Sequence, residues 1–362
     1  MLSVSQTRGV TQIVRAGESD VFHNRLTHTM KVAQLGLRIA QNVTEKQPQE
    51  AAFHDINADV VEAACLAHDL GHPPFGHMGE YVLNSLVLGK PIEGKEPRWK
   101  ADENGFEGNA QSFRVITKLA VRFSGEDGLD LTRATLGAVI KYPWKRDPDI
   151  PSQTSKWGYY EDDLEDFEFA RVGFQHKEKT AEAEIMDWAD DIAYSVHDLE
   201  DFHRCGAIPW ARIFPLDPDR DPVDLDRMIT NVKEKWYGHP SDADGRLRRA
   251  HERLSKLITT VGSNLILEPY EGTREQRQKI RLLTSQLIGR YLPAIRLSTE
   301  AEYSDTKVAV AIDQKMSDEV RLLKQIARDY IISSSALAGQ QKGQKRILQD
   351  LFQDIYDDIS SD

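Results

Sequence analysis

The chain has 362 residues, of which 40% are hydrophobic and 29% are charged, a composition typical of a soluble globular protein with one or two domains. Its formal net charge of -12 argues against a general electrostatic attraction to nucleic acid or to an anionic membrane. Cys65 and Cys205 are its two cysteines, so no disulfide framework is expected. No apolar stretch reaches membrane-spanning length and no signal pattern opens the chain, so we expect a cytoplasmic protein.

Apolar residues recur at helical spacing along most of the chain, and no alternating strand series interrupts them. The predicted helices cover residues 25–43, 58–67, 75–88, 106–119, 131–139, 180–204, 226–236, 246–261, 275–291, 317–332 and 343–359. Residues 147–169 are expected to be irregular, with the acidic run at 161–166 on a solvated surface. The pattern predicts an all-α fold, and the proline-rich connector at 208–222 divides it into a helical core at 1–208 and a C-terminal helical region packed on it at 209–362.

Residues 65–81 concentrate ligand-type side chains in an otherwise apolar run, which avoids such groups unless they are paired or bind something. These side chains are those of His68, Asp69, His72, His77 and Glu80. The helix at 58–67 delivers His68 and Asp69 at its C-terminal end. After the Pro73-Pro74 turn, a second helix carries His77 and Glu80 three residues apart on one face. A histidine-aspartate pair at a helix end is a common half-site for a divalent metal.

Two ligands do not hold a metal, so other parts of the chain must supply more. His28 lies in the first turn of the helix at 25–43. Asp190, Tyr194 and Asp198 follow one another at intervals of four on the helix at 180–204, so they share one edge of it. Two imidazoles and two carboxylates would suit Mn, Fe, Mg or Zn and leave positions for water and substrate. Such a metal could polarise a phosphorus atom, and the charged partner Glu80 would orient His77 for proton transfer.

The order of these residues resembles the HD superfamily of metal-dependent phosphohydrolases, and most closely its bacterial dGTP triphosphohydrolases and dGTPase-like proteins. The motifs that carry the resemblance are R-L-T-H-T at 25–29, A-H-D-L-G-H-P-P-F-G-H-x-G-E at 67–80, F-E-G-N-A-Q at 106–111, K-Y-P-W at 141–144 and A-D-D-I-A-Y-x-x-x-D-L-E-D at 189–201. With L-L-K at 322–324 and G-Q at 343–344 nearer the end, the resemblance covers most of the chain. The resemblance implies an HD-type core at 1–208 that hydrolyses dGTP, with room for other dNTPs, to deoxynucleoside and inorganic triphosphate by attack on the α-phosphorus.

The resemblance also implies residue roles. The expected metal ligands are His28, His68, Asp69 and Asp190, with Asp191 as the competing choice for the last. His77 and Glu80 match the pair that promotes attack on the α-phosphorus. The positions expected to contact substrate are Gln12, Arg25, His72, Lys141, Tyr142, Tyr194 and Asp198. Tyr194 matches the residue thought to exclude a ribose 2′-OH.

The expected cofactor is one divalent ion per site, Mn²⁺ or Mg²⁺, with Fe, Co, Ni and Zn as alternatives. The expected partners are a dNTP substrate, a dNTP activator and further copies of the chain in a tetramer or hexamer. Relatives carry a longer segment before T-Q-[VI], whereas Thr11 lies ten residues from the start here, which leaves substrate affinity and subunit number open.

Two other functions remain open at this stage. One is an HD phosphohydrolase that acts on a nucleoside monophosphate or a cyclic nucleotide, against which the H-P-P-F-G-H-x-G-E motif argues. The other is a nucleotide-sensing or nucleic-acid-binding protein that has kept the pocket. A local basic patch at 246–253 would favour the latter, and the complete ligand set speaks against it.

Overall fold

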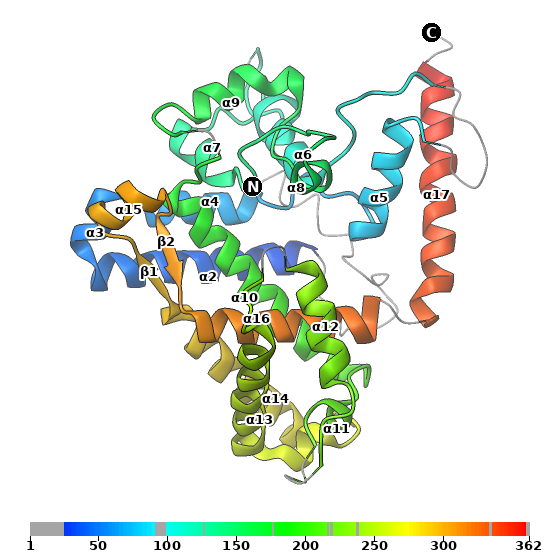
Figure 1. The fold of residues 1–362 in the computed structure, drawn as a ribbon. Coiled ribbons are helices and arrows are strands. Elements are labelled where there is room, and N and C mark those ends of the chain that lie inside the picture. The colour runs from blue at the N-terminus through cyan, green and yellow to red at the C-terminus, as the bar shows by residue number, and fades with distance from the viewer. Residues whose placement is uncertain are drawn as a thin grey trace. The chain divides into compact units, whose positions relative to one another are not determined.

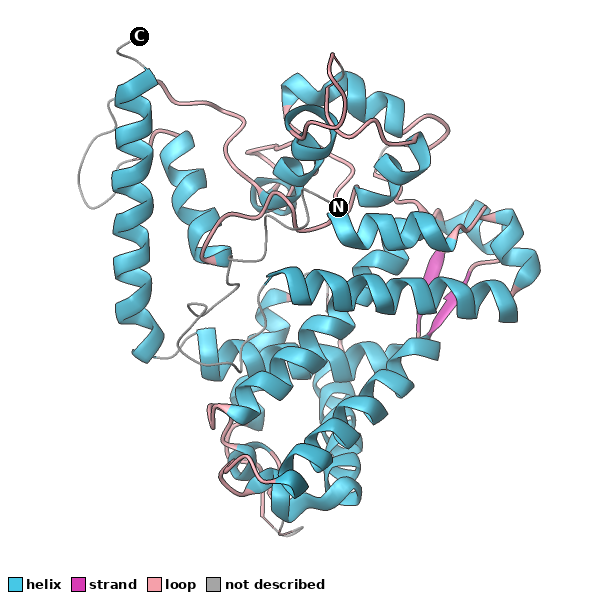
Figure 2. Cartoon of the chain, turned by 180° about the vertical axis from the view of Figure 1, so that it is seen from behind, coloured by secondary structure: helices cyan, strands magenta, loops and turns pink. Residues whose placement is uncertain are grey.

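The computed structural model describes residues 25–90, 99–125, 127–175, 177–215, 217, 220–236, 239–332 and 335–359 (Figure 1). Nearly all regular structure in these ranges is helical, and the strands β1 (Ile295–Leu297) and β2 (Val310–Ile312) form a small two-stranded sheet (Figure 2). The all-α prediction is confirmed. None of the described helices combines the length and the apolarity that crossing a membrane requires.

The helices follow the chain in this order: α2 (Arg25–Lys46), α3 (Pro48–Phe53), α4 (Ala58–Ala67), α5 (Gly76–Val87), α6 (Gly108–Arg114), η2 (Val115–Leu119), α7 (Arg133–Val139), α8 (Pro151–Ser155), η3 (Glu161–Asp163), α9 (Leu164–Ala170), α10 (Ala181–Arg204), α11 (Trp210–Ile213), α12 (Leu225–Lys235), α13 (Ala243–Leu267), α14 (Arg274–Tyr291), η4 (Leu292–Ala294), α15 (Glu300–Thr306), α16 (Gln314–Ala327), η5 (Arg328–Ile332) and α17 (Ser335–Ile359).

The chain divides into two compact units. The first comprises Met1–Ala189, Leu297–Ala309 and Ala338–Asp362, and the second comprises Asp190–Arg296 and Val310–Leu337. The division falls inside α10, between Ala189 and Asp190. The domain limit after Ile208 that the sequence suggested therefore lies within the second unit, and it stays a prediction.

In the first unit, α2 packs along α4 through a close approach at Gly36. A Cβ atom at Gly36 would lie 2.5 Å from Sγ of Cys65, so glycine at this position lets the two helices come together. The contact is apolar, because Val32 and Ile39 of α2 and Val61 of α4 are fully buried. This packing fixes the start of α2 beside the C-terminal end of α4.

In the second unit, α13 packs against α14 and α16, and carboxylates of α16 neutralise its arginines. Arg246 makes two hydrogen bonds with the carboxylate of Asp318, at 2.8 and 3.0 Å, and Arg253 bonds to the fully buried Glu319 at 2.6 Å. Arg248 forms ion pairs with two other carboxylates, those of Asp226 and Asp244. These ion pairs bind three of the four arginines of the suspected basic patch to the protein's own acids, which weakens the case for nucleic-acid binding there.

The stretch from 147 to 169 departs from the expectation of irregular structure, because it contains α8, η3 and α9. Its acidic run is only partly solvated. Asp162 is exposed, whereas Asp163 is fully buried and lies 3.0 Å from Nε of Arg114. A buried carboxylate is stable where a guanidinium meets it, and such a partner 49 residues away is not visible in a local charge pattern.

Candidate functional site

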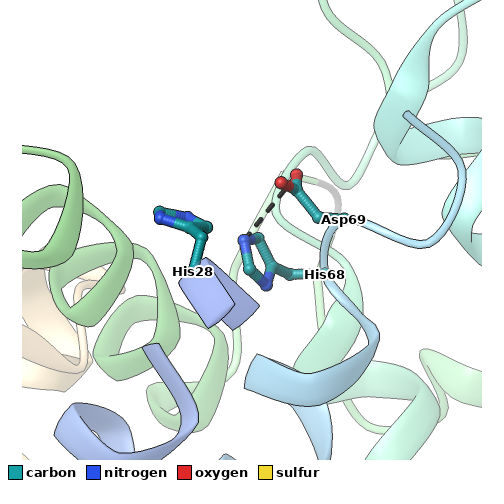
Figure 3. Close-up of side chains that lie close together, drawn as sticks. All are labelled: His28, His68 and Asp69. Carbon is teal, nitrogen blue, oxygen red and sulfur yellow. Dashed lines mark ion pairs between the residues drawn. The ribbon is translucent and has the colours of Figure 1, made fainter. Parts of the chain in front are cut away.

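A cluster of two imidazoles and one carboxylate forms where α2 begins and α4 ends. His28 lies in the first turn of α2, and His68 and Asp69 follow the last residue of α4. One ligand atom from each of the three side chains lies within 4.8 Å of the others (Figure 3). His28 and His68 are buried and Asp69 is 15% exposed, so the cluster is enclosed but reachable.

The geometry of His68 directs one ring nitrogen toward this cluster. Nδ1 of His68 lies 2.6 Å from the carbonyl oxygen of Cys65, one turn back on α4. Because a carbonyl oxygen only accepts, the ring proton sits on Nδ1, and Nε2 carries the lone pair. Nε2 lies 3.7 Å from Oδ1 of Asp69, the contact that the dashed line marks in Figure 3. A backbone carbonyl that fixes the tautomer is the usual second support of a metal-ligating histidine.

His72 lies next to Asp69, with its Nδ1 atom 3.0 Å from Oδ1 of that carboxylate. Burial alone would raise the pKa of Asp69, but the neighbouring imidazoles of His72 and His68 outweigh it and hold the pKa well below its ordinary value. Burial would lower the pKa of His72, but the charge of Asp69 outweighs the effect of burial, so the pKa of His72 is raised. Asp69 is therefore ionised, as a metal ligand must be.

The ring of His72 rests against the start of α6. A Cβ atom at Gly108 would lie 2.7 Å from Nδ1 and Cε1 of His72, so only glycine leaves room for this ring. Arg25 holds the following turn from the other side, because its buried guanidinium donates hydrogen bonds to the carbonyl oxygens of His72 and Pro73. Arg25 thus lies beside the cluster, with its described hydrogen bonds made to the backbone.

A second charged group extends from His72 along α5. The side chain of His77 is 64% exposed, and its Nδ1 atom lies 3.4 Å from Oε2 of Glu80. Glu80 also accepts a hydrogen bond from the backbone N–H of Gly108 at 3.0 Å. Lys156 lies 2.8 Å from Oε1 of Glu80 and 2.7 Å from Oε1 of Glu107. Burial would raise the pKa of Glu80, but the hydrogen bond with His77 and the charge of Lys156 outweigh it, so the pKa is well below its ordinary value.

The turn between α4 and α5 accounts for the prolines and glycines of the motif at 72–80. Phe75 precedes α5 with a left-handed backbone, at φ 69°, which is uncommon for a bulky residue. A Cβ atom at Gly79 would lie 2.0 Å from the carbonyl oxygen of Pro74, so α5 can fold back over the turn only with glycine there. These constraints fix where His77 and Glu80 lie.

Lys141 and Tyr142 follow α7 and belong to a separate charged group. Asp187 of α10 lies 2.7 Å from Nζ of Lys141 and 3.0 Å from Nζ of Lys179. Burial would raise the pKa of Asp187, but the charges of the two lysines outweigh it and lower the pKa. The ammonium of Lys179 lies 6.0 Å from the centre of the Tyr142 ring. Lys141 and Lys179 therefore both bind the carboxylate of Asp187.

Three further predicted residues lie in the second unit, on α10. Asp190 is the first residue of that unit, and Tyr194 and Asp198 follow it at intervals of four. Asp198 is buried, and burial together with the charge of Asp198 raises the pKa of Tyr194. Asp191 lies 2.5 Å from Nζ of Lys324, whose ammonium is 5.8 Å from the centre of the Tyr194 ring.

The structure thus brings together His28, His68, Asp69 and His72, and it pairs His77 with Glu80. Gln12 lies outside the described residues. Sequence reasoning missed Lys156, Glu107 and Asp187, which complete the charged groups. Glu107 lies within the motif F-E-G-N-A-Q and could have been suspected there, whereas no motif surrounds Lys156.

Comparisons with known proteins agree with this geometry. The family model "HD domain" matches residues 25–195. A "Deoxyguanosinetriphosphate triphosphohydrolase-like protein" of Streptomyces coelicolor is 34% identical over 358 residues, which cover 95% of this chain and 76% of the relative. Proteins of the same description from Bifidobacterium longum and Corynebacterium glutamicum (strain R) are 34% and 30% identical over 94% of this chain, and the matches cover 66% and 73% of those relatives. With its His/Asp cluster and HD domain, the chain belongs to the family of deoxyguanosinetriphosphate triphosphohydrolase-like proteins, which are HD-type metal-dependent phosphohydrolases.

Proposed function

We propose that this protein is a dNTP triphosphohydrolase that converts dGTP, and with it other dNTPs, to deoxynucleoside and inorganic triphosphate. The observation that carries the proposal is the His28, His68 and Asp69 cluster, with the charged residues that continue from it through His72 to Glu80. The names of the relatives point to the same substrate.

The residues of the cluster fit a divalent cation. The buried imidazole of His68 has its tautomer set by Cys65, and Asp69 is ionised, so both offer lone pairs. A cation bound there would act as a Lewis acid toward a phosphate oxygen and would lower the pKa of a water molecule. We propose His28, His68, Asp69 and Asp190 as its ligands.

His77 and Glu80 are proposed to handle the proton of the attacking water. Glu80 is ionised and orients Nδ1 of His77, so Nε2 of that imidazole is the atom that accepts a proton. The large exposure of His77 lets it reach a substrate that enters from solvent. Water oxygen would form the new bond to the α-phosphorus as the bond to the 5′ oxygen breaks, and the 5′ oxygen would leave as the deoxynucleoside hydroxyl after taking a proton.

A triphosphate needs local positive charge in a chain with a net charge of -12. His72, whose pKa is raised, and Lys141, which shares Asp187 with Lys179, supply such charge in the first unit. We assign them to the phosphates, with the remaining predicted contacts made by the side chains of Gln12, Arg25, Tyr142, Tyr194 and Asp198. Tyr194 and Asp198 lie on one edge of α10, and we assign them to the deoxyribose, where a tyrosine ring can exclude a 2′-OH.

The proposal extends to Mn²⁺ or Mg²⁺ as the ion, with Fe, Co, Ni and Zn as alternatives. It also includes a cytoplasmic location, a homo-oligomer with the subunit number open, and a second dNTP as activator.

The test is a product assay on the purified protein with Mn²⁺ or Mg²⁺. Each of the four dNTPs is supplied alone and in mixtures, GTP serves as the ribonucleotide control, and products are separated by anion-exchange chromatography. We expect inorganic triphosphate and deoxynucleoside in equal amounts, and little product from GTP. Pyrophosphate with dNMP, or no turnover of any dNTP or mixture, would refute the proposal. Hydrolysis of nucleoside monophosphates or cyclic nucleotides instead would assign the chain to another HD phosphohydrolase activity.

A further inference from the structure

Helix α17 presents apolar side chains in two neighbouring rows, and only one row is covered. The covered row packs beside α5, where Leu348 is buried against Val82 and Leu86 (Figure 1). Further along the same row, the Phe352 ring lies 4.9 Å from the ring of Trp99. This contact attaches α17 to the first unit and fixes which side of the helix faces outward.

The second row lies along the outer edge of α17. Ile347, Leu351, Ile355 and Ile359 follow one another at intervals of four, and they are 58%, 53%, 50% and 72% exposed. Side chains at this spacing form one continuous stripe on a helix. Single exposed apolar residues are ordinary, but a continuous stripe of four large aliphatic side chains marks an interaction surface.

The row of charges next to the stripe indicates what covers it. The residue before each stripe position is charged and exposed, which gives a second row of Arg346, Asp350, Asp354 and Asp358, and the exposed Lys342 continues this row one turn earlier. The row is basic at its N-terminal end and acidic at its C-terminal end. When two identical helices pair antiparallel about a two-fold axis, a flanking row meets the same row of its partner in the opposite direction. Arg346 of one copy then faces the acidic end of the other.

We infer that the outer edge of α17 is a self-association surface, on which α17 of a second copy packs antiparallel about a two-fold axis near Leu351. Charge complementarity selects this occupant and this direction, because only in the antiparallel pair does the charged row meet the charged row of the partner, with Arg346 near Asp354 and Asp358. Around that axis Ile347 of each copy meets Ile355 of the other, so the apolar stripe is self-complementary as well.

The stripe alone makes a modest interface. Each copy buries on the order of 400 Å² of apolar surface in this pairing, which places the contact at the low end of specific interfaces. The pair is therefore concentration-dependent when it acts alone, and in a larger assembly it links subunits or dimers. This inference does not depend on the proposed activity, since its readout is mass and cross-linking.

The first experiment measures mass against concentration for the full chain by sedimentation velocity. We expect the double variant L351E/I355E to raise the dissociation constant of this contact by roughly 100-fold, because it puts two charged groups into the centre of an apolar contact. R346E alone should weaken association, and R346E/D354K should restore it, because the exchanged charges again face each other. Circular dichroism and the melting temperature show whether each variant keeps its fold.

The second experiment fixes the direction of the pair by disulfide cross-linking, in a Cys205→Ser background because Cys205 is exposed. Leu351→Cys lies near the axis and should form a homodimeric disulfide under mild oxidation. Ile359→Cys is the matched control: it lies about 12 Å from the axis along the helix, so the two copies are about 24 Å apart and should not react. Equal cross-linking of both variants would mean a parallel pair and overturn the inference. Unchanged mass of folded L351E/I355E, whether because another protein or another part of the chain covers the stripe, would overturn it as well.

Discussion

Lys156 lies between two carboxylates that come from distant parts of the chain. Its ammonium is 2.8 Å from Oε1 of Glu80 and 2.7 Å from Oε1 of Glu107, at separations of 76 and 49 residues. Burial would lower the pKa of Lys156, but the two carboxylates outweigh it and raise the pKa. Lys156 thereby keeps the partly buried carboxylate of Glu80 ionised, and the ionised Glu80 orients His77.

Lys156→Met should move the acidic limb of the activity profile to higher pH. Without the ammonium, burial and the charge of Glu107 raise the pKa of Glu80, so the carboxylate that orients His77 is lost at a higher pH than before. The rate constant at pH 5 should therefore fall more than the rate constant at pH 8. Lys145→Met is the matched control, because it removes an exposed ion pair with Glu161 outside the site. A uniform loss over all pH values would contradict this role.

His77→Ala should cut turnover by roughly 100-fold while the metal stays bound, since a lost proton-transfer group typically costs this much. His77 is not in the His/Asp cluster and its side chain is mostly exposed, so the fold should not change. Steady-state rates and metal analysis on the same preparation separate the two effects. Full activity of the variant would remove His77 from the proposed mechanism.

Asp69→Ala should abolish metal binding and activity together, because the carboxylate is an essential part of the cluster.

Asp190→Asn and Asp191→Asn decide between the two candidates for the last ligand. We expect Asp190→Asn to lower the metal content measured by inductively coupled plasma mass spectrometry. Asp191→Asn should leave the metal content unchanged and lose only the ion pair with Lys324. The reverse result would make Asp191 the ligand.

The helices that carry the site could be predicted because local pattern determines them. The apolar spacing in 25–43 and 58–67 is amphipathic over several turns, and α4 begins and ends where the sequence indicated. Since His68 and Asp69 follow directly after α4, their place at a helix end was also predictable. The pairing of His77 with Glu80 follows from the same argument, since three residues on a helix is one turn.

The rest of the site could not be predicted, because it depends on contacts between loops that are far apart in sequence. Lys156 follows the short helix α8 in a stretch without amphipathic pattern, and only the folded chain brings it to Glu80. Asp163 is similar, since its neighbours are exposed acids and its partner Arg114 lies on α6. The local sequence pattern predicts which face of a helix is apolar, but it does not predict which distant basic residue forms an ion pair with a buried carboxylate.

Gly108→Ala should impair activity through His72. The new Cβ atom would lie 2.7 Å from the His72 ring, so the ring has to move away from Gly108 and from Asp69. We expect a loss of turnover with little change in the helical circular dichroism. Gly289→Ala is the control, because Gly289 lies in α14 with no atom near its Cβ position. That variant should raise the free energy of unfolding by about 0.5 to 1 kcal/mol and keep its activity.

The last prediction concerns acid stability and starts from His203 in the second unit. Its Nδ1 atom accepts a hydrogen bond from the indole N–H of Trp210 at 2.9 Å, which requires an unprotonated Nδ1. Burial, with the charge of Arg204, lowers the pKa of His203 to about 4. The unfolded chain protonates this histidine near its ordinary pKa of about 6.5, so below that pH the unfolded state binds the additional proton. The free energy of unfolding therefore falls as the pH drops from about 6.5 to about 4.

The decrease attributable to His203 is on the order of 3 kcal/mol over that range. His203→Gln removes the titration but keeps an acceptor for Trp210, so its unfolding free energy should depend less on pH between 7.5 and 4.5. Urea unfolding followed by tryptophan fluorescence at several pH values measures the difference. His239→Gln is the matched control, because it makes the same substitution at an exposed histidine of the same unit, and the pH dependence of both variants is compared with that of the unaltered protein. If both variants show the same pH dependence as that protein, another buried group is responsible for the acid sensitivity of the second unit.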